Sequence, residues 1–404
     1  MTGFARRRIT VIGYHRDTMS ARALDKLATA TLVVAGERYF DLLPVPERAQ
    51  RCAFGRLDTA LDVIAAHQGH VVVVASGDPG FFGIVRALAE RFGPDELEVL
   101  PALSSVAAAF SRLGLPWDDA VVVSAHGRDI RPAINACRAY PKVAVLTGPG
   151  TGPRELAQGL AGTGRRLAVL SNLGEPGESV VRMDVDEAAK TEFAGPLNVT
   201  VVLDEQRLVG QRRVFAGPPR APRRWALHED AYEHRDSMIT KSEVRALALA
   251  KLGPGLGDLV WDVGAGSGSV AVECARFGAA VIAIERDPQA CAMIRRNAQA
   301  HDVYVEVVEG SAPEAFAGLP DPDAIFVGGG AMEVIEASAR RGAQRVVVAL
   351  AALERVSRTR RVLSRAGYAV GGVLLHAERL TELPDGVHRL AAVNPVFVLW
   401  GERR

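Results

Sequence analysis

Short apolar runs alternate with segments of helical periodicity along nearly the whole chain. Each run has the length of a buried strand, and the segments between the runs place apolar residues three or four positions apart. This alternation predicts an α/β architecture. In the first half of the chain the expected strands are 9–12, 32–35, 71–75, 121–124, 143–147, 167–171 and 199–203.

A segment rich in proline and arginine interrupts the alternation. Gly217-Pro-Pro-Arg-Ala-Pro-Arg-Arg224 contains three prolines and three arginines, too rigid and too polar for the interior of an element. We therefore expect two domains, 1–216 and 235–404, joined by a linker at 217–234. Seven strands with one glycine turn after the first predict a doubly wound, Rossmann-like sheet in the second domain, with its site at the carboxyl ends. The expected strands there are 260–263, 280–284, 303–307, 324–327, 345–349, 370–375 and 392–399.

The first strand of the second domain runs into a turn with three glycines. In Val260-Trp-Asp-Val-Gly-Ala-Gly-Ser-Gly-Ser269 the glycines let the backbone turn sharply and approach a ligand closely. Glu285 ends the next strand, where a carboxylate can bind the ribose hydroxyls of an adenosine. The order of strand, glycine turn, helix and acid favours a nucleotide-like cofactor over a glycine turn without a ligand.

Two details favour S-adenosylmethionine over a dinucleotide. The third glycine comes one position earlier than in G-x-G-x-x-G, and Ser269 holds the expected place. Asp262 would repel a pyrophosphate by about 4 kcal/mol per close pair of unit charges at an intermediate dielectric, whereas it would attract the ammonium of a methionine moiety. The expected cofactor contacts here are Asp262, Gly264, Ala265, Gly266, Ser267, Gly268 and Glu285.

Two further segments are expected beside this cofactor. Ser311 and Ala312 follow the third strand of the second domain, so their backbone is placed to bind the adenine edge. Upstream, Thr240 with Glu243 three residues on has the pattern of a capped helix start. Thr240 is expected to cap a helix that lies over the cofactor.

The loop after the fourth strand of the second domain is built of small residues. Gly328, Gly329 and Gly330 would leave open space beside the reactive methyl, which suits a large acceptor. An acceptor that carries carboxylates needs cationic partners. The candidates for this contact are Arg245, Arg358, Arg360 and Arg361.

Composition and charge argue against several classes of function. The 48 basic and 47 acidic residues nearly cancel, so no global field attracts nucleic acid or an anionic membrane. No apolar run approaches the roughly 20 residues that a membrane helix needs, and the four cysteines form no C-x-x-C pair. We expect a soluble cytoplasmic protein with no metal site and no nucleic-acid or membrane partner.

The motifs of the second domain together resemble one known family. They are Thr240-Lys-Ser-Glu-Val-Arg-Ala-Leu-Ala-Leu249, the glycine turn, Glu285, Gly310-Ser-Ala-Pro-Glu-Ala315 and Val327-Gly-Gly-Gly330. In this combination the second domain resembles the precorrin carbon-15 methyltransferase and decarboxylase family of cobalamin biosynthesis. The resemblance implies methyl transfer from S-adenosylmethionine to a tetrapyrrole.

Loops of small residues also follow successive strands in the first domain. They are Ala75-Ser-Gly-Asp-Pro-Gly-Phe-Phe-Gly83, Pro101-Ala-Leu-Ser-Ser-Val106, Ser124-Ala-His-Gly-Arg128 and Leu146-Thr-Gly-Pro-Gly-Thr-Gly-Pro153. In this order they resemble the tetrapyrrole methylase family, most closely its precorrin carbon-5 branch, in which S-adenosylmethionine lies between two α/β subdomains. The cofactor contacts that the resemblance implies are Gly13, Gly77, Asp78, Phe81, Ser104 and Ser105.

One loop departs from the tetrapyrrole methylase pattern. The family usually follows its first strand with Gly-x-Gly facing the tetrapyrrole, whereas this chain has Gly13-Tyr-His15. His15 thus places a side chain where backbone is expected. It is a candidate contact to the acceptor, or a sign of altered catalysis in this half.

Together the two domains resemble the precorrin-6Y C5,15-methyltransferase (decarboxylating) family. The resemblance implies methylation of precorrin-6Y at carbons 5 and 15, loss of the ring C acetate carboxyl in the second domain, and precorrin-8x as product. It also implies self-association, and we expect a homo-oligomer, a tetramer built on the second domains.

Two alternatives remain open on the residues alone. One is a methyltransferase for small molecules or nucleic acid that uses only the second site; an Asn-Pro-Pro-Tyr type loop would favour it, and Val327-Gly-Gly-Gly330 does not supply one. The other is a first domain that only carries the tetrapyrrole or serves assembly. Methyl transfer needs alignment more than a strong base, and we assign no catalytic residue from the sequence.

Overall fold

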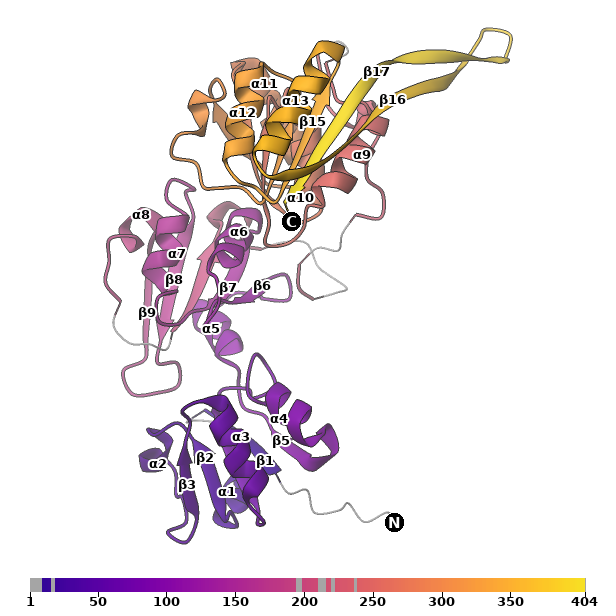
Figure 1. Ribbon diagram of the computed structural model, residues 1–404. Helices are drawn as coiled ribbons and strands as arrows, with labels where there is room; N and C mark the ends of the chain where they lie inside the picture. The colour runs from indigo at the N-terminus through magenta and orange to yellow at the C-terminus, as the bar shows by residue number, and fades with distance from the viewer. Residues whose placement is uncertain are drawn as a thin grey trace.

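The computed structural model describes residues 9–15, 19–193, 198–209, 216–218, 222–235 and 238–403. Helices surround three β-sheets in these residues (Figure 1). The α/β class expected from the apolar pattern is confirmed. Part of the proline- and arginine-rich segment, 219–221, lies outside the described residues.

The first sheet is entirely parallel, with the order β3-β2-β4-β1-β5. Its central strands carry apolar side chains on both faces because helices cover both sides, and Val71 to Val74 are fully buried. The strands are β1 (Ile9–Tyr14), β2 (Leu32–Ala35), β3 (Gln50–Ala53), β4 (Val71–Ser76) and β5 (Leu97–Leu100), and the helices are α1 (Ala21–Ala28), α2 (Tyr39–Leu42), α3 (Leu57–Ala66) and α4 (Val85–Phe92).

The second sheet is mixed, with the order β6-β7-β10-β8-β9. Strands β6 and β7 are parallel, and β10 is antiparallel to both β7 and β8. The strands are β6 (Val121–Ser124), β7 (Lys142–Leu146), β8 (Arg166–Ser171), β9 (Ser179–Asp184) and β10 (Asn198–Leu203), and the helices are α5 (Ser105–Leu113), α6 (Arg131–Ala139), α7 (Pro153–Gly159) and α8 (Val185–Ala188).

The third sheet has seven strands in the order β13-β12-β11-β14-β15-β17-β16. Its first five strands are parallel. Strands β12 and β13 are added on one side of β11, and β14 and β15 on the other side, as expected for a doubly wound sheet. The strands are β11 (Leu259–Val263), β12 (Ala280–Glu285), β13 (Glu306–Glu309), β14 (Ala324–Val327), β15 (Arg345–Leu350), β16 (Tyr368–Glu382) and β17 (His388–Arg403), and the helices are α9 (Ser242–Leu252), α10 (Ser269–Arg276), α11 (Pro288–Ala300), α12 (Met332–Arg340) and α13 (Leu353–Arg365).

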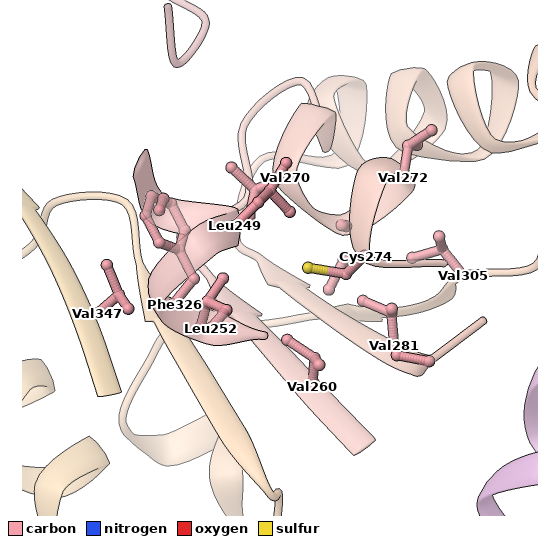
Figure 2. Packing of buried hydrophobic residues seen from close by; sticks show 14 of the residues in the cluster. Leu249, Leu252, Val260, Val270, Val272, Cys274, Val281, Val305, Phe326 and Val347 are labelled. Atoms are coloured by element: carbon pink, nitrogen blue, oxygen red, sulfur yellow. The ribbon is translucent and has the colours of Figure 1, made fainter. Parts of the chain in front are cut away.

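Two apolar layers enclose this third sheet. Successive residues of a strand point to opposite faces, so Val260 packs with α9 and α10 while Trp261 packs with α12 and α13. Figure 2 shows the first layer, in which Leu249 and Leu252 of α9 and Val272 of α10 gather around the strands. The same alternation directs Asp262, two residues after Val260, towards the α9 and α10 side.

Strands β16 and β17 continue far beyond the rest of the third sheet. The pairing of β15 with β17 ends at Leu350 opposite Phe397, whereas β16 and β17 pair onward from Ala377 opposite Val393 to the end of the hairpin. The segment 377–393 therefore projects as a two-stranded arm from the carboxyl edge of the parallel strands, as Figure 1 shows. The sequence predicted only 370–375 of β16 and 392–399 of β17.

Helix α6 of the second sheet docks on the amino edge of the third sheet. Arg131 donates to the carboxylate of Asp323 (3.1 Å), just before β14, and the Asn135 amide donates to the carbonyl of Gly257 (2.9 Å), just before β11. Arg138 donates to the carboxylate of Glu306, the first residue of β13. The carboxyl edge of the third sheet thus faces away from α6.

Within the described residues, no helix combines the length and the apolarity that a membrane crossing requires.

Candidate functional site

The glycine turn after β11 presents backbone, not side chains, at the carboxyl edge of the third sheet. Gly264 and Gly266 have positive φ angles of 72° and 56°, and a Cβ atom on either would meet nothing within 4 Å. Gly268 has a different role, because a Cβ there would lie 2.9 Å from Ile294 of α11. Two glycines therefore border open space, and the third lets α10 and α11 pack closely.

Glu285 at the end of β12 is tied to the glycine turn. Its Oε2 accepts a hydrogen bond from the N–H of Gly266 (2.9 Å), and its Oε1 accepts from the N–H groups of Arg286 (2.8 Å) and Asp287 (3.1 Å). Three backbone donors fix the carboxylate beside the turn. Its half-buried position leaves it within reach of a ligand at this edge.

Asp262 is a buried carboxylate with one free oxygen. Its Oδ2 accepts from the N–H of Ala271 in the first turn of α10 (2.9 Å), whereas Oδ1 has no hydrogen-bond partner among the described residues. Burial disfavours the charged form and raises the pKa of Asp262 to about 7; the Ala271 N–H opposes this shift, and the nearby charge of Glu285 adds to it. An unsatisfied carboxylate oxygen at this place suits a cationic group such as an ammonium.

The loops after β13 and β14 border the same turn. The N–H of Gly310 donates to the carbonyl of Glu285 (2.9 Å), which places Ser311 and Ala312 next to this acid. The N–H of Gly328 donates to the carbonyl of Val263 (3.0 Å). A side chain at 328 would press on the turn, because its Cβ would lie 3.0 Å from the carbonyl oxygen of Gly264.

Helix α9 starts differently from the sequence expectation. Its N-cap is Lys241, without a side-chain hydrogen bond, so the expectation that the Thr240 side chain caps the helix is wrong. The first helical N–H, that of Ser242, donates to the carboxylate of Glu229 (2.8 Å), and Glu243 bonds to Arg379. The capping group comes from a separate segment, which a local pattern does not reveal.

Arg245 is not available to an acceptor, and that expectation is wrong. Its side chain is fully buried, and it donates to the carbonyls of Thr240 (2.5 Å) and Leu227 beside Glu273. The guanidinium thus fixes the segment before α9 from within the fold. The other three arginine candidates, Arg358, Arg360 and Arg361, lie exposed on α13.

Two residues near this edge escaped the sequence analysis. Asn297 of α11 donates to the carbonyls of Ser267 (2.8 Å) and Glu233 (2.8 Å), so it joins the glycine turn to the segment before α9. Arg355 of α13 donates to the carbonyl of Gly330. Neither residue belongs to a short motif, and only the three-dimensional contacts reveal them.

A cleft of about 420 Å³ lies between the first and second sheets. Loops after β1, β4 and β5 line it from one side, and loops after β6, β7 and β8 line it from the other. Of the residues expected to bind the cofactor in the first domain, four line this cleft: Gly77, Asp78, Phe81 and Ser105. Arg38 and Arg128, which the sequence analysis did not select, add two cationic side chains to the lining.

Gly13 and Ser104 are not among the residues that line this cleft. A Cβ on Gly13 would come within 2.4 Å of the carbonyl oxygen of Gly77, so glycine is needed there for the close approach of β1 and β4. The Ser104 side chain caps α5 by accepting from the N–H of Ala107 (3.1 Å). Both residues support the lining loops.

His15 lines the cleft with its ring almost wholly buried, at 7% exposure. Neither ring nitrogen has a hydrogen-bond partner within the ranges that the structure describes. The loop between β8 and β9 packs against the ring, and a Cβ on Gly174 would lie 2.4 Å from its Nε2. The sequence departure after β1 thus brings an unsatisfied imidazole to the wall of the cleft.

Comparison with known proteins finds two family models on this chain. The model for tetrapyrrole (corrin/porphyrin) methylases matches residues 13–189, and the model for the precorrin methyltransferase domain matches residues 230–398. The two matched ranges do not overlap. The first range contains strands β2 to β9, and the second contains strands β11 to β16.

One curated relative matches most of the chain, and two others match less than half of it. A precorrin-6Y C(5,15)-methyltransferase [decarboxylating] from a Sinorhizobium species is 39% identical over 82% of this chain and 81% of its own length. A cobalt-precorrin-7 C(5)-methyltransferase from Salmonella typhimurium is 30% identical over 49% of this chain and 100% of its own. A probable cobalt-precorrin-6B C(15)-methyltransferase (decarboxylating) from Pyrobaculum calidifontis is 33% identical over 42% of this chain and 92% of its own length.

Proposed function

Because the chain belongs to the precorrin-6Y C5,15-methyltransferase (decarboxylating) family, we propose that it methylates precorrin-6Y at carbons 5 and 15 and decarboxylates the ring C acetate, giving precorrin-8x. S-adenosylmethionine is the proposed donor at both sites. The observation that carries the proposal is the presence of both methyltransferase family models on one chain, at 13–189 and 230–398. Two sites in one polypeptide match two methylations of one substrate.

The donor site of the third sheet is proposed to serve carbon 15 and the decarboxylation. The donor carries a sulfonium methyl that reacts by in-line displacement. The free oxygen of Asp262 would hold the ammonium of the donor, and Glu285 its ribose hydroxyls. Backbone at Ser311 and Ala312 would meet the adenine, and Thr240 would cover the donor from the α9 side. The turn contributes the backbone of Gly264, Ala265, Gly266, Ser267 and Gly268.

The acceptor is proposed to lie beside the loop of Gly328, Gly329 and Gly330. Gly329 and Gly330 have φ angles of 111° and 123°, and a Cβ on Gly329 would meet nothing within 4 Å, so the loop leaves room for a macrocycle. Arg355 donates to the Gly330 carbonyl, and we propose that it also binds a peripheral carboxylate of the acceptor.

The cleft of the first domain is proposed to serve carbon 5. Gly77, Asp78, Phe81 and Ser105 would contact the donor, while Gly13 and Ser104 hold the lining loops in place. The unsatisfied ring of His15 would face the acceptor together with Arg38 and Arg128. These three side chains supply hydrogen-bond donors for a carboxylate-rich ring.

Catalysis at both sites is proposed to depend on alignment. An electron-rich macrocycle supplies its own nucleophilic carbon, so the protein mainly has to hold carbon, methyl and sulfur in line, an effect of about 7–11 kcal/mol in favourable systems. For the decarboxylation, an electron-poor imine of the substrate takes up the electron pair as carbon dioxide leaves. The chain's contribution is to keep water and a stabilising cation away from that one carboxylate.

The division of the chain into domains 1–216 and 235–404, the cytoplasmic location and a homotetramer remain predictions. Light scattering of the full-length protein tests the tetramer. A monomer across micromolar concentrations would contradict it.

Two full-length variants test the assignment of the sites. Gly77→Leu fills the first cleft, and Asp262→Ala removes the ammonium contact of the second site. With precorrin-6Y and donor, Gly77→Leu should yield a product with one added methyl and one lost carbon dioxide, whereas Asp262→Ala should lose the decarboxylation. Gly93→Leu is a matched control, because Gly93 also has a positive φ (86°) but lies at the end of α4 outside the cleft lining. Mass spectrometry reads all three products, and one variant that abolished both methylations and the decarboxylation would contradict separate sites.

A further inference from the structure

One arginine joins the projecting arm (377–393) to the start of helix α9. Arg379 lies on β16, opposite Ala391 in the arm. Its Nη1 and Nη2 donate to the two carboxylate oxygens of Glu229 (2.9 Å each), and its Nε and Nη2 donate to the two oxygens of Glu243 (2.8 and 2.6 Å). A single guanidinium therefore holds two carboxylates, each through two hydrogen bonds.

Both carboxylates are ionised partners at neutral pH. The hydrogen bonds from Arg379 lower the pKa of Glu229 to about 2, although burial opposes the shift, and they lower the pKa of Glu243 as well. The Glu229 side chain is only 6% exposed. Removal of Arg379 would leave the buried charge of Glu229 without its main partner. The hydrogen bonds to Glu229 and to Glu243 would be lost together, because one guanidinium makes both.

The two carboxylates flank the segment that leads into α9. Glu229 lies in the 3₁₀ turn Glu229–Ala231, and Glu243 is the second residue of α9. Glu229 also accepts the N–H of Ser242, where α9 has no side-chain cap of its own. Arg379 thus holds the chain on both sides of the segment 238–241, which contains Thr240.

This segment lies at the donor edge of the third sheet. The opposite end of α9, at Gly253, accepts a hydrogen bond from Arg345, the first residue of β15 (3.3 Å). Helix α9 therefore runs antiparallel to the parallel strands, and its start is at their carboxyl ends. Ile239 of the segment packs in the same apolar cluster as Ala265 of the glycine turn.

We propose that Arg379 is a positioning residue that couples the arm to the donor site, by holding the segment 238–241 over the bound donor. The inference rests on the proposed function of the third sheet. Its consequence is reciprocal: whatever restrains the arm strengthens donor binding, and donor binding restrains the arm.

Arg379→Gln in the full-length protein tests the coupling, with Arg389→Gln as matched control. Arg389 lies on the same arm, and its exposed side chain makes no ion pair among the described residues. Calorimetry with S-adenosylhomocysteine in the Gly77→Leu background isolates the second site. If, in Arg379→Gln, only about one tenth of the molecules hold the segment 238–241 in the position seen here, S-adenosylhomocysteine binds about tenfold more weakly. The KM for the donor then rises, while kcat stays within about twofold of wild type.

Hydrogen exchange of the arm amides separates coupling from general destabilisation. In the wild-type chain, S-adenosylhomocysteine should slow exchange in 377–393, and in Arg379→Gln this slowing should be lost. Arg379→Lys keeps the charge without the fork of donors, so it should show an intermediate affinity; it serves as the test if Arg379→Gln does not fold. Unchanged affinity in a folded Arg379 variant, or ligand-induced slowing that survives it, overturns the coupling alone. Absence of any binding at this site in the wild-type chain overturns the proposed function with it.

Discussion

Donor binding at the third sheet should depend on pH through Asp262. In the free protein the pKa of this buried carboxyl is raised to about 7, so it is mostly protonated in mild acid. A donor ammonium favours the ionised form, which means that binding expels a proton and the affinity rises with pH until Asp262 is fully ionised. The perturbation that tests this is Asp262→Asn, which keeps the shape and removes the charge.

The expected size follows from the fraction of ionised Asp262. At about pH 6 roughly one tenth of the free protein is ionised, and at about pH 7.5 roughly three quarters, so the apparent affinity should rise about eightfold between them. In Asp262→Asn the slope should vanish. At about pH 7.5 its binding should be weaker by about tenfold to a hundredfold, the size of a lost hydrogen bond between charged groups.

Calorimetry with S-adenosylhomocysteine measures both effects, and a smaller ligand supplies the control. 5′-Methylthioadenosine shares the adenosine but lacks the ammonium, so its affinity should not change over the same pH range. The measurements use the Gly77→Leu background, in which the first cleft is filled, so the heat of binding comes from the second site. A pH-independent affinity for S-adenosylhomocysteine with Asp262 intact, or an undiminished slope in Asp262→Asn, would refute the reasoning.

The same carboxyl makes a prediction about stability without donor. Its folded pKa lies above the ordinary value of 3.8, so the fold binds the proton more tightly than the unfolded chain does. The free energy of unfolding should therefore fall as pH rises from about 4 to about 7, by up to about 4 kcal/mol for a shift of about three units. Asp262→Asn should lack this loss in urea unfolding followed by circular dichroism, and an equal or steeper loss in the variant would contradict the assignment.

Two further substitutions test buried polar contacts. Lys142 is fully buried and donates to Asp119 (2.6 Å). Lys142→Met should lower the free energy of unfolding by about 3–5 kcal/mol, because it leaves this carboxylate unpaired. Urea unfolding measures the change, and a variant as stable as wild type would show that Asp119 finds another partner. Asn297→Ala removes the contact to the Ser267 carbonyl, and it should weaken S-adenosylhomocysteine binding at the second site severalfold while the first site keeps its affinity. Equal weakening at both sites, read by calorimetry of the two isotherms, would mean that Asn297 acts on the whole fold and not on the turn.

The sequence predicts strands well where they are buried. The parallel strands of the third sheet are short apolar runs, and they were found at nearly the expected positions. Strand β13 starts at Glu306 and not at 303, although Val303 and Val305 pack in the core. Strands β3, β5 and β9 were missed. Five of the six residues of β9 and three of the four residues of β3 are exposed, so neither strand has a buried apolar run to detect.

Local patterns failed where distant segments supply the partner. The Thr240 and Glu243 spacing predicted a capped helix, whereas the cap comes from Glu229 and is fixed by Arg379, 150 residues from it in sequence. Arg245 was expected to contact the carboxylates of the acceptor, and it instead bonds buried carbonyls. The glycine turn was predictable because strand, turn and acid are close in sequence and their geometry is local.

The docking of α6 on the third sheet bears on how a tetrapyrrole passes between the two proposed sites. Arg131 and Arg138 hold the amino edge of that sheet, while the donor edge lies beyond the five residues of β11, a span of about 17 Å of strand. The α6 contact and the donor edge are therefore separated by the length of the parallel strands. If the cleft between the first two sheets and this edge hold the two proposed methylation sites, we expect a ring methylated at one site to be released before it binds at the other.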